Sequence, residues 1–190
     1  DSQRTKTEGA VLGGLLGGLI GLATGDEKGA AIGAVLGAGA GYLIGNEVAK
    51  RKEKYASTEE FLDAEIARTA EFNETARAQH GRLRKEIAAL DRETLELQAR
   101  YRQGSATRAQ LSERKRDLDA RLAKNRDFEQ VLQKEYDLNT EILAAERGSR
   151  PTNDPYLSRL EKENDELRLQ IEQLREGSNQ LAEINERLSV

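Results

Sequence analysis

Residues 155–188 read PYLSRLEKENDELRLQIEQLREGSNQLAEINERL, and their apolar side chains recur at alternating spacings of three and four. This heptad repeat is typical of a helix that buries one stripe against another helix. With Leu157 at position a, every d position is leucine, and Asn164 and Asn185 occupy a positions. Leucine at d favours parallel dimers, and a buried asparagine at a fixes their register. The segment is therefore predicted to be helical and to pair with a second copy.

The sequence also predicts where this C-terminal coiled coil, residues 155–190, begins. Asp154 is a favourable N-cap and Pro155 suits the first helical position, so residues 148–154 are predicted to be a linker. Glu163 at position g is placed to meet Arg168 at position e of a parallel partner. The residues assigned to self-association are Leu157, Leu160, Asn164, Leu167, Ile171, Leu174, Leu181, Asn185 and Leu188.

Upstream, residues 57–147 carry two more helical repeats. The first begins with Ser57 and Glu60, the signature of a capping box at a helix N-terminus. Its stripe is diluted by polar side chains, so we expect a long helix that is weakly stable alone. The stripe consists of Leu62, Ile66, Thr69, Asn73, Ala76, His80, Leu83, Ile87, Leu90, Thr94, Leu97 and Tyr101.

The repeat is interrupted around Gly104, and Thr107 with Gln110 offers a second capping box. A second helix is expected over residues 108–146. Two helices of similar length joined by a short loop predict an antiparallel helical hairpin. One long helix with a flexible point at Gly104 is the alternative.

The composition favours exposed helices over a large compact core. Of 190 residues, 34 % are charged, 37 % hydrophobic and 4 % aromatic, whereas ordinary globular domains are about 45–50 % apolar and about 25 % charged. Because the chain has no Cys, disulfides, thiol nucleophiles and cysteine-type zinc sites are excluded. The net charge of −4 does not indicate nucleic-acid binding.

Residues 1–50 differ from the rest because they hold 13 of the 17 glycines. In water, glycine at every fourth position weakens a helix by about 1 kcal/mol each relative to alanine. In lipid, small residues at this spacing let helix backbones approach closely. We therefore predict a transmembrane helical hairpin, with a polar turn at residues 26–28. Its packing residues are Gly9, Gly13, Gly17, Gly21, Gly25, Gly29, Gly33, Gly37, Gly41 and Gly45.

The two apolar stretches of the hairpin would each span roughly 25 Å, which suits a thin membrane such as a bacterial outer membrane. Cations follow the second stretch, and we assign Lys50, Arg51, Lys52 and Lys54 to lipid head groups. In an outer membrane the coiled coil would face the periplasm; an inner membrane is the second choice. A soluble linker and a buried hairpin that serves assembly without crossing the bilayer are the other interpretations.

The stretch GAAIGAVLGAGAGYLIG, residues 29–45, resembles the glycine-zipper domains (two-transmembrane, YMGG-like) of bacterial envelope proteins. The resemblance covers about residues 9–48. Many members of that family are outer-membrane lipoproteins, which implies an N-terminus tethered close to the hairpin. The motif is specific for close helix packing and says little about a particular biochemical role.

Residues that carry chemistry are scarce outside these patterns. His80 has heptad spacing and is interpreted as a seam residue. Basic clusters such as Arg114–Arg116 lie among acids without interleaved aromatic residues, which favours a helix surface over nucleic-acid contact. The glycines at 37–41 lack the spacing and the lysine of a phosphate loop. We predict no catalytic, metal or cofactor site, no small-molecule substrate and no nucleic-acid partner.

These features together predict an all-α, non-enzymatic, membrane-anchored oligomeric scaffold of the bacterial envelope, a structural subunit of a larger assembly. Its expected partners are membrane lipid, further copies of the chain and other envelope proteins. The alternative is a pore formed by a ring of glycine-zipper hairpins. Neither apolar stretch carries a polar stripe that would line water, which is what a conducting path requires.

If the glycine faces hold neighbouring helices together, Gly17→Leu and Gly37→Leu should dissociate the detergent-solubilised oligomer, because a leucine side chain prevents the close approach of two backbones. The mass of the protein–detergent particle can be measured by light scattering. An unchanged mass in both variants would count against packing through these glycines.

Overall fold

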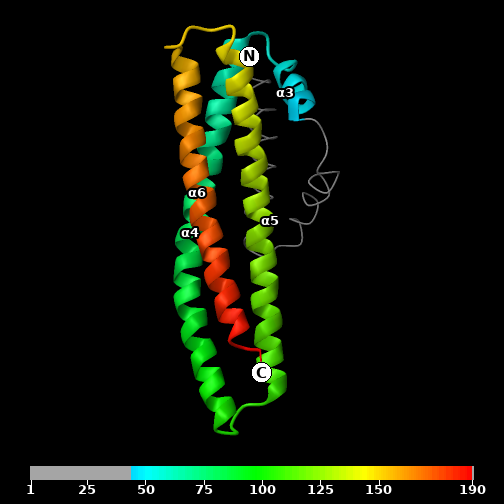
Figure 1. Cartoon of the computed structure of the whole chain (residues 1–190), viewed down its shortest axis with the longest axis vertical. Helices are drawn as coiled ribbons and strands as arrows, with labels where there is room; N and C mark the ends of the chain where they lie inside the picture. Colours follow the sequence, from blue (N-terminus) through cyan, green and yellow to red (C-terminus); the bar gives the residue numbers. More distant parts are fainter. Residues whose placement is uncertain (1–43, 190) are drawn as a thin grey trace, which may run out of the picture.

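The computed structural model of the chain describes residues 44–189. Within this range it is all helical, with α3 over Ile44–Lys52, α4 over Thr58–Arg102, α5 over Arg108–Arg147 and α6 over Pro155–Glu186. The three long helices form an up-down-up bundle, and α3 lies beside α5 near the end where α4 begins (Figure 1). None of these helices combines the length and the apolar character needed to cross a membrane. Most of the hairpin predicted for residues 1–50 lies outside the described residues.

The helices begin where the sequence predicts because a side chain at each start satisfies free backbone N–H groups. All three predicted N-caps are confirmed. Ser57 accepts from the backbone of Glu60, Thr107 forms a reciprocal capping box with Gln110, and Asp154 accepts from the backbones of Tyr156 and Leu157.

The chain reverses between α4 and α5, which decides between the two alternatives that the sequence left open. Gly104 has a φ of +73°, a left-handed conformation that glycine adopts without strain. The backbone carbonyl of Arg100 accepts hydrogen bonds from the backbones of Ser105 and Ala106 and closes the turn. Residues 57–147 therefore form the antiparallel hairpin and not one continuous helix.

Helix α6 fills the groove between α4 and α5. It contacts both helices extensively, whereas α4 and α5 contact each other much less. Its leucines at the d positions are almost completely buried: Leu160, Leu167, Leu174, Leu181 and Leu188. The heptad pattern predicts a second copy at this seam, whereas two helices of the same chain, α4 and α5, cover it in the structure. A heptad repeat specifies an apolar stripe but not which helix covers it, and the short turn at residues 148–154 returns α6 onto its own hairpin.

The polar residues of the α6 seam fix register within the chain. Asn164 Nδ2 donates to Thr140 Oγ1 of α5 at 3.2 Å, and Asn185 donates to Asp119 of the same helix. Ser178 accepts from Asn125 Nδ2 at 2.6 Å. The α6 residue of each contact is buried, and a register shift would break all three hydrogen bonds. The register selection predicted for a dimer therefore operates between α5 and α6.

Glu163 also has a different partner from the one that the sequence suggested. Instead of meeting Arg168 of a second copy, its carboxylate accepts from Asn73 Nδ2 of α4 at 2.9 Å. The backbone carbonyl of Glu163 accepts from the same amide, also at 2.9 Å. This contact fixes α6 against α4 in the way that Asn164 fixes it against α5.

The buried apolar residues form two clusters along the bundle. The smaller one, at the α3 end, includes Phe61, Leu62, Ile142 and Leu160. The larger one extends from Phe72 and Phe128 toward the α4–α5 turn, and it includes Leu167, Leu174 and Leu181 of α6. A buried hydrogen bond between the clusters, from Asn139 Nδ2 to Thr69 Oγ1 at 2.9 Å, joins α5 to α4.

The close approach of α6 to α4 at Gly177 generates a stability prediction. A methyl group there would sit 3.3 Å from Leu83 Cγ and even nearer to one of its terminal carbons, whereas a methyl group at Gly81 meets nothing within 4 Å. Both positions are helical, so both alanines gain about 1 kcal/mol of helix propensity. Crowding offsets this gain only at Gly177, so Gly177→Ala should be about 1–3 kcal/mol less stable than Gly81→Ala in urea unfolding. Equal stabilities would show that the interface is loose.

Candidate functional site

The most distinctive site of the structure is the place where α3 docks onto the bundle. Arg51 of α3 inserts its guanidinium between two carboxylates of other helices. Its Nη1 lies 2.8 Å from Glu65 Oε2 of α4 and 3.1 Å from Glu135 Oε1 of α5. The three side chains are 11 %, 3 % and 4 % exposed, respectively. The contact is therefore a buried ion-pair cluster that joins three helices.

Further charged groups complete this cluster. Arg68 Nε lies 3.0 Å from Glu135 Oε1, and its guanidinium stacks over the ring of Phe72 at 5.7 Å. On the outer side, Glu47 lies 3.4 Å from Arg51, and Lys134 Nζ lies 3.0 Å from Glu47 Oε2. The charges alternate in sign across the cluster, which compensates each buried ion with neighbours of opposite charge.

Burial and pairing oppose each other in this cluster. Desolvation raises the pKa of Glu65, although Arg51 and Arg68 act to lower it. Burial alone would lower the pKa of Arg51, but Glu135 and Glu65 hold it above its ordinary range, so the guanidinium stays charged. Arg51 is thus the main compensation for Glu65. Undocking of α3 would remove the cation that compensates Glu65, so α3 is part of the bundle and not a free extension.

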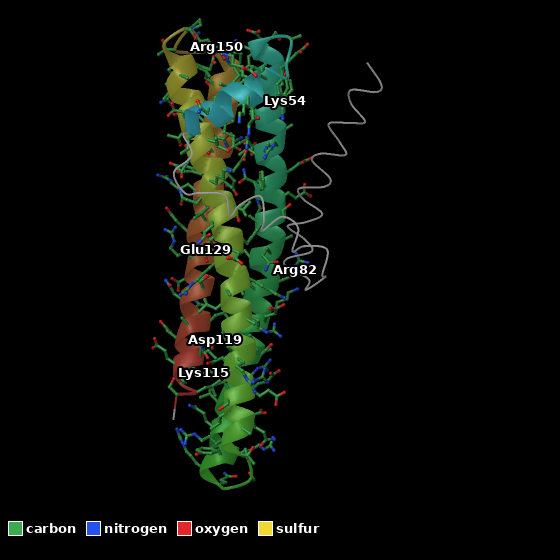
Figure 2. The ribbon with its side chains drawn as sticks, turned by 90° about the vertical axis from the view of Figure 1, so that its right-hand side faces the viewer. Lys54, Arg82, Lys115, Asp119, Glu129 and Arg150 are labelled. Atoms are coloured by element: carbon green, nitrogen blue, oxygen red, sulfur yellow. The ribbon has the colours of Figure 1, made fainter. Side chains whose placement is uncertain are left out.

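A second group of charges surrounds the turn between α5 and α6, at the same end of the bundle, where Figure 2 places Arg150. Lys52 of α3 pairs with Glu146 of α5. Arg150 lies 2.9 Å from Asp154 and 3.6 Å from Glu146, and it also pairs with Glu59 of α4. These contacts connect α3, the start of α4 and the α5–α6 turn.

Apolar side chains on either side of Arg51 support the docking. Val48 of α3 and Tyr55, which follows α3, pack against the smaller core cluster. The ring of Tyr55 lies 5.8 Å from that of Phe61, centroid to centroid. The junction combines apolar burial, which supplies attraction, with ion pairs that accept only one geometry.

The four cations assigned to lipid head groups have different positions in the structure. Arg51 is enclosed by carboxylates, so the docked conformation does not offer it to lipid, and Lys52 pairs with Glu146. Lys50 and Lys54 are exposed at this end of the molecule, and their contact with lipid stays a prediction. The reason for the difference is that acids distant in the sequence converge on Arg51 only after folding.

The other predicted site residues divide into two groups. Gly45 lies at the start of α3, is exposed and has open space around it; the remaining glycines of the series, Gly9 to Gly41, lie outside the described residues. The nine residues assigned to self-association are all buried. Eight of them lie along the face of α6 that packs against α4 and α5, and Leu188 follows the end of the helix.

Sequence reasoning did not identify the carboxylates of the docking site, although one signal was present. Glu135 lies three residues after Leu132 and three before Leu138, so it occupies the buried stripe of α5. An acid in that position requires a cation from another element. Glu65 directly precedes the seam residue Ile66 and gave no comparable signal.

Residues 8–52 match a protein-family model, Gly-zipper_Omp, which is described as a glycine zipper. The match confirms the glycine-zipper domain and indicates an association with the bacterial outer membrane or envelope. Searches of curated proteins and of solved structures found no match. The matched segment ends at Lys52, the last residue of α3. The docking site therefore joins the end of the glycine-zipper domain to the helical bundle.

Replacement of Arg51 by methionine should weaken the docking of α3, because it removes the cation that pairs with Glu65 and Glu135 while keeping much of the apolar side chain. The loss of one partner from a buried pair destabilises by about 3–5 kcal/mol. Arg77→Met is a matched control, because its pair with Glu166 is exposed and should contribute less than about 1 kcal/mol. Hydrogen exchange of the amides in residues 44–52 and urea unfolding measure the two effects.

The pH dependence of the same variant has a definite sign. Since the pKa of Glu65 is raised in the folded state, its contribution favours folding below the unfolded pKa near 4.5 and declines as pH rises through the folded value. Loss of Arg51 raises the folded pKa further, so the Arg51→Met defect should be larger at pH 8 than at pH 5. A defect equal at both pH values would contradict the role of Arg51 as the partner of Glu65.

Proposed function

We propose that this chain is a non-enzymatic, oligomeric scaffold of the bacterial envelope in which the glycine zipper is a membrane anchor and the bundle is a stiff spacer. The observation that carries the proposal is the docking of α3, because the helix that ends the glycine-zipper match is also fixed to the bundle by Arg51. An anchor joined through a flexible linker would not set the direction of the bundle.

The dimensions of the bundle support a spacer role. Helix α4 has 45 residues, which corresponds to a length of about 67 Å. Helices α5 and α6 cover much of that length, and α3 docks at one end (Figure 1). A membrane that holds the glycine zipper would therefore hold the far end of the bundle several tens of ångströms away, in the periplasm if the membrane is the outer one.

In this proposal the glycine zipper, and not α6, carries the contacts between copies of the chain. The α6 seam is already covered by α4 and α5, so a second copy would reach it only if the bundle opened. Glycines at every fourth position are suited to close packing between helices of different copies. The pore alternative depends on the same glycine-zipper residues, and none of the features described for residues 44–189 favours it.

Flotation with liposomes tests the anchor. Two acids placed in the apolar stretches, Leu16→Asp with Leu36→Asp, should abolish co-flotation of the full chain, because a carboxylate within the bilayer core costs about 2.5–3.5 kcal/mol on insertion scales. The matched control is Leu95→Asp with Leu169→Asp, which makes the same chemical change at leucines exposed on the bundle. Equal flotation of the two double variants would contradict membrane anchoring by the zipper.

A further inference from the structure

The end of the bundle opposite α3 carries a concentration of positive charge. We define the hairpin tip as residues 100–116, which contain the end of α4, the turn and the start of α5. This stretch holds one carboxylate, Glu113. It holds six cations: Arg100, Arg102, Arg108, Arg114, Lys115 and Arg116. The whole chain has a net charge of −4, so this excess of cations is local.

The fold gathers these cations around one protruding end. Helix α6 ends at Glu186, and Ser189, just beyond it, accepts a hydrogen bond through Oγ from Lys115 Nζ at 2.7 Å. Beyond that level the tip consists of α4 and α5 alone, and the C-terminal end of α6 stops short of the turn (Figure 1). Figure 2 shows the same arrangement from the side, with Lys115 above the turn. Cations from two helices thus surround a free end of the rod.

Some of the tip cations already have partners within the chain. Arg114 pairs with Glu93 and lies 3.7 Å from Asp117. By contrast, Arg100, Arg102 and Arg116 are exposed, and within residues 44–189 none of them makes an ion pair. Three guanidinium groups of the tip are therefore unneutralised by neighbouring carboxylates.

The tip is also a rigid support. The carbonyl of Arg100 accepts from Ser105 at 2.9 Å and from Ala106 at 3.2 Å, and the capping box of Thr107 begins α5 immediately afterwards. Ala106 is buried under the turn. Because the backbone is already ordered, a ligand that binds there would not have to order it.

The opposite end has no comparable excess of cations over acids. Residues 53–65, at the start of α4, contain five acids and one cation, Lys54. Cations at the same end offset these acids, and Glu59, Asp63 and Glu65 are already in ion pairs. The unpaired cations of the hairpin tip would therefore turn that end of the rod toward an anionic partner.

We propose that the hairpin tip binds a flexible anionic polymer whose repeating charges are carboxylates or phosphates. Guanidinium groups pair bidentately with both. Arg116 lies eight residues beyond Arg108 on α5, about 12 Å along the helix. A flat surface would reach only the outermost cations, whereas a flexible chain wraps around the tip and reaches all of them.

The position of the one aromatic residue of the tip narrows the class of polymer that it can recognise. Tyr101 is half-buried and packs against the larger core cluster, so the tip presents no aromatic platform for nucleobases. Charge, and not base identity, is therefore recognised. The proposal does not depend on membrane anchoring, because the tip lies at the end of the bundle opposite α3.

The test uses the full chain in a neutral detergent, with fluorescently labelled polyglutamate and polyphosphate of matched charge as probes. Arg100→Gln, Arg102→Gln and Arg116→Gln are combined in one tip variant. The control variant removes the same charge from exposed positions of α6, Arg159→Gln, Lys162→Gln and Arg168→Gln. Circular dichroism verifies that both variants remain helical.

Fluorescence anisotropy at low salt should show binding of at least one probe by the native chain and the control variant, and about 100-fold weaker binding by the tip variant. The probe bound more tightly identifies carboxylate or phosphate as the preferred group. Binding should also weaken as salt screens the exposed charges. Equal affinities of the two variants, or binding to anionic vesicles but to neither polymer, would overturn the proposal. A salt-sensitive loss of oligomer mass in the tip variant without polymer binding would also overturn it, because it would indicate that the tip contacts acids of a second copy.

Discussion

The packing of α6 into the groove between α4 and α5 is the constraint on which the rest of the structure depends. The two helices of the hairpin contact each other little, so their apolar stripes are buried mainly by α6. Its leucines supply the hydrophobic contact, while Asn164, Ser178 and Asn185 select one register through hydrogen bonds to α5. Without that register, Glu65 and Glu135 would not stand side by side to receive α3.

Two segments of very different composition are joined in this chain. A glycine-rich segment suited to close helix packing in lipid is followed directly by helices that are charged on their surfaces. Arg51 makes the join because its guanidinium reaches carboxylates on both α4 and α5. A buried ion pair is a weak source of net stability but tolerates little displacement. The junction therefore fixes the orientation of α3 on the bundle more than it adds to the free energy of unfolding. This suits the proposed role of the bundle as a spacer.

Much of the fold is predictable from the sequence because the signals are local. Ser57, Thr107 and Asp154 mark helix starts, and the heptad stripes identify the buried faces of α4, α5 and α6. The partner of α6 is not local information, since a leucine at position d packs equally well against its own chain and another. The docking site was missed for a related reason: Arg51 and Glu135 are far apart in the chain, and only the bundle brings them together. The basic tip likewise appears in the sequence as cations among acids, and becomes a patch when α4 and α5 fold back.

The most direct test of this account is a distance measurement between α3 and α6 by pulsed electron paramagnetic resonance. The chain has no cysteine, so cysteines at the exposed positions of Asn46 and Lys162 provide the only spin-labelling sites. A docked α3 and an α6 folded onto its own chain predict one narrow distance distribution, unchanged when labelled chains are diluted with unlabelled ones. A broad distribution would show that α3 is not fixed to the bundle. A distance that disappears on dilution would show that α6 packs on another copy, and either result would contradict the account.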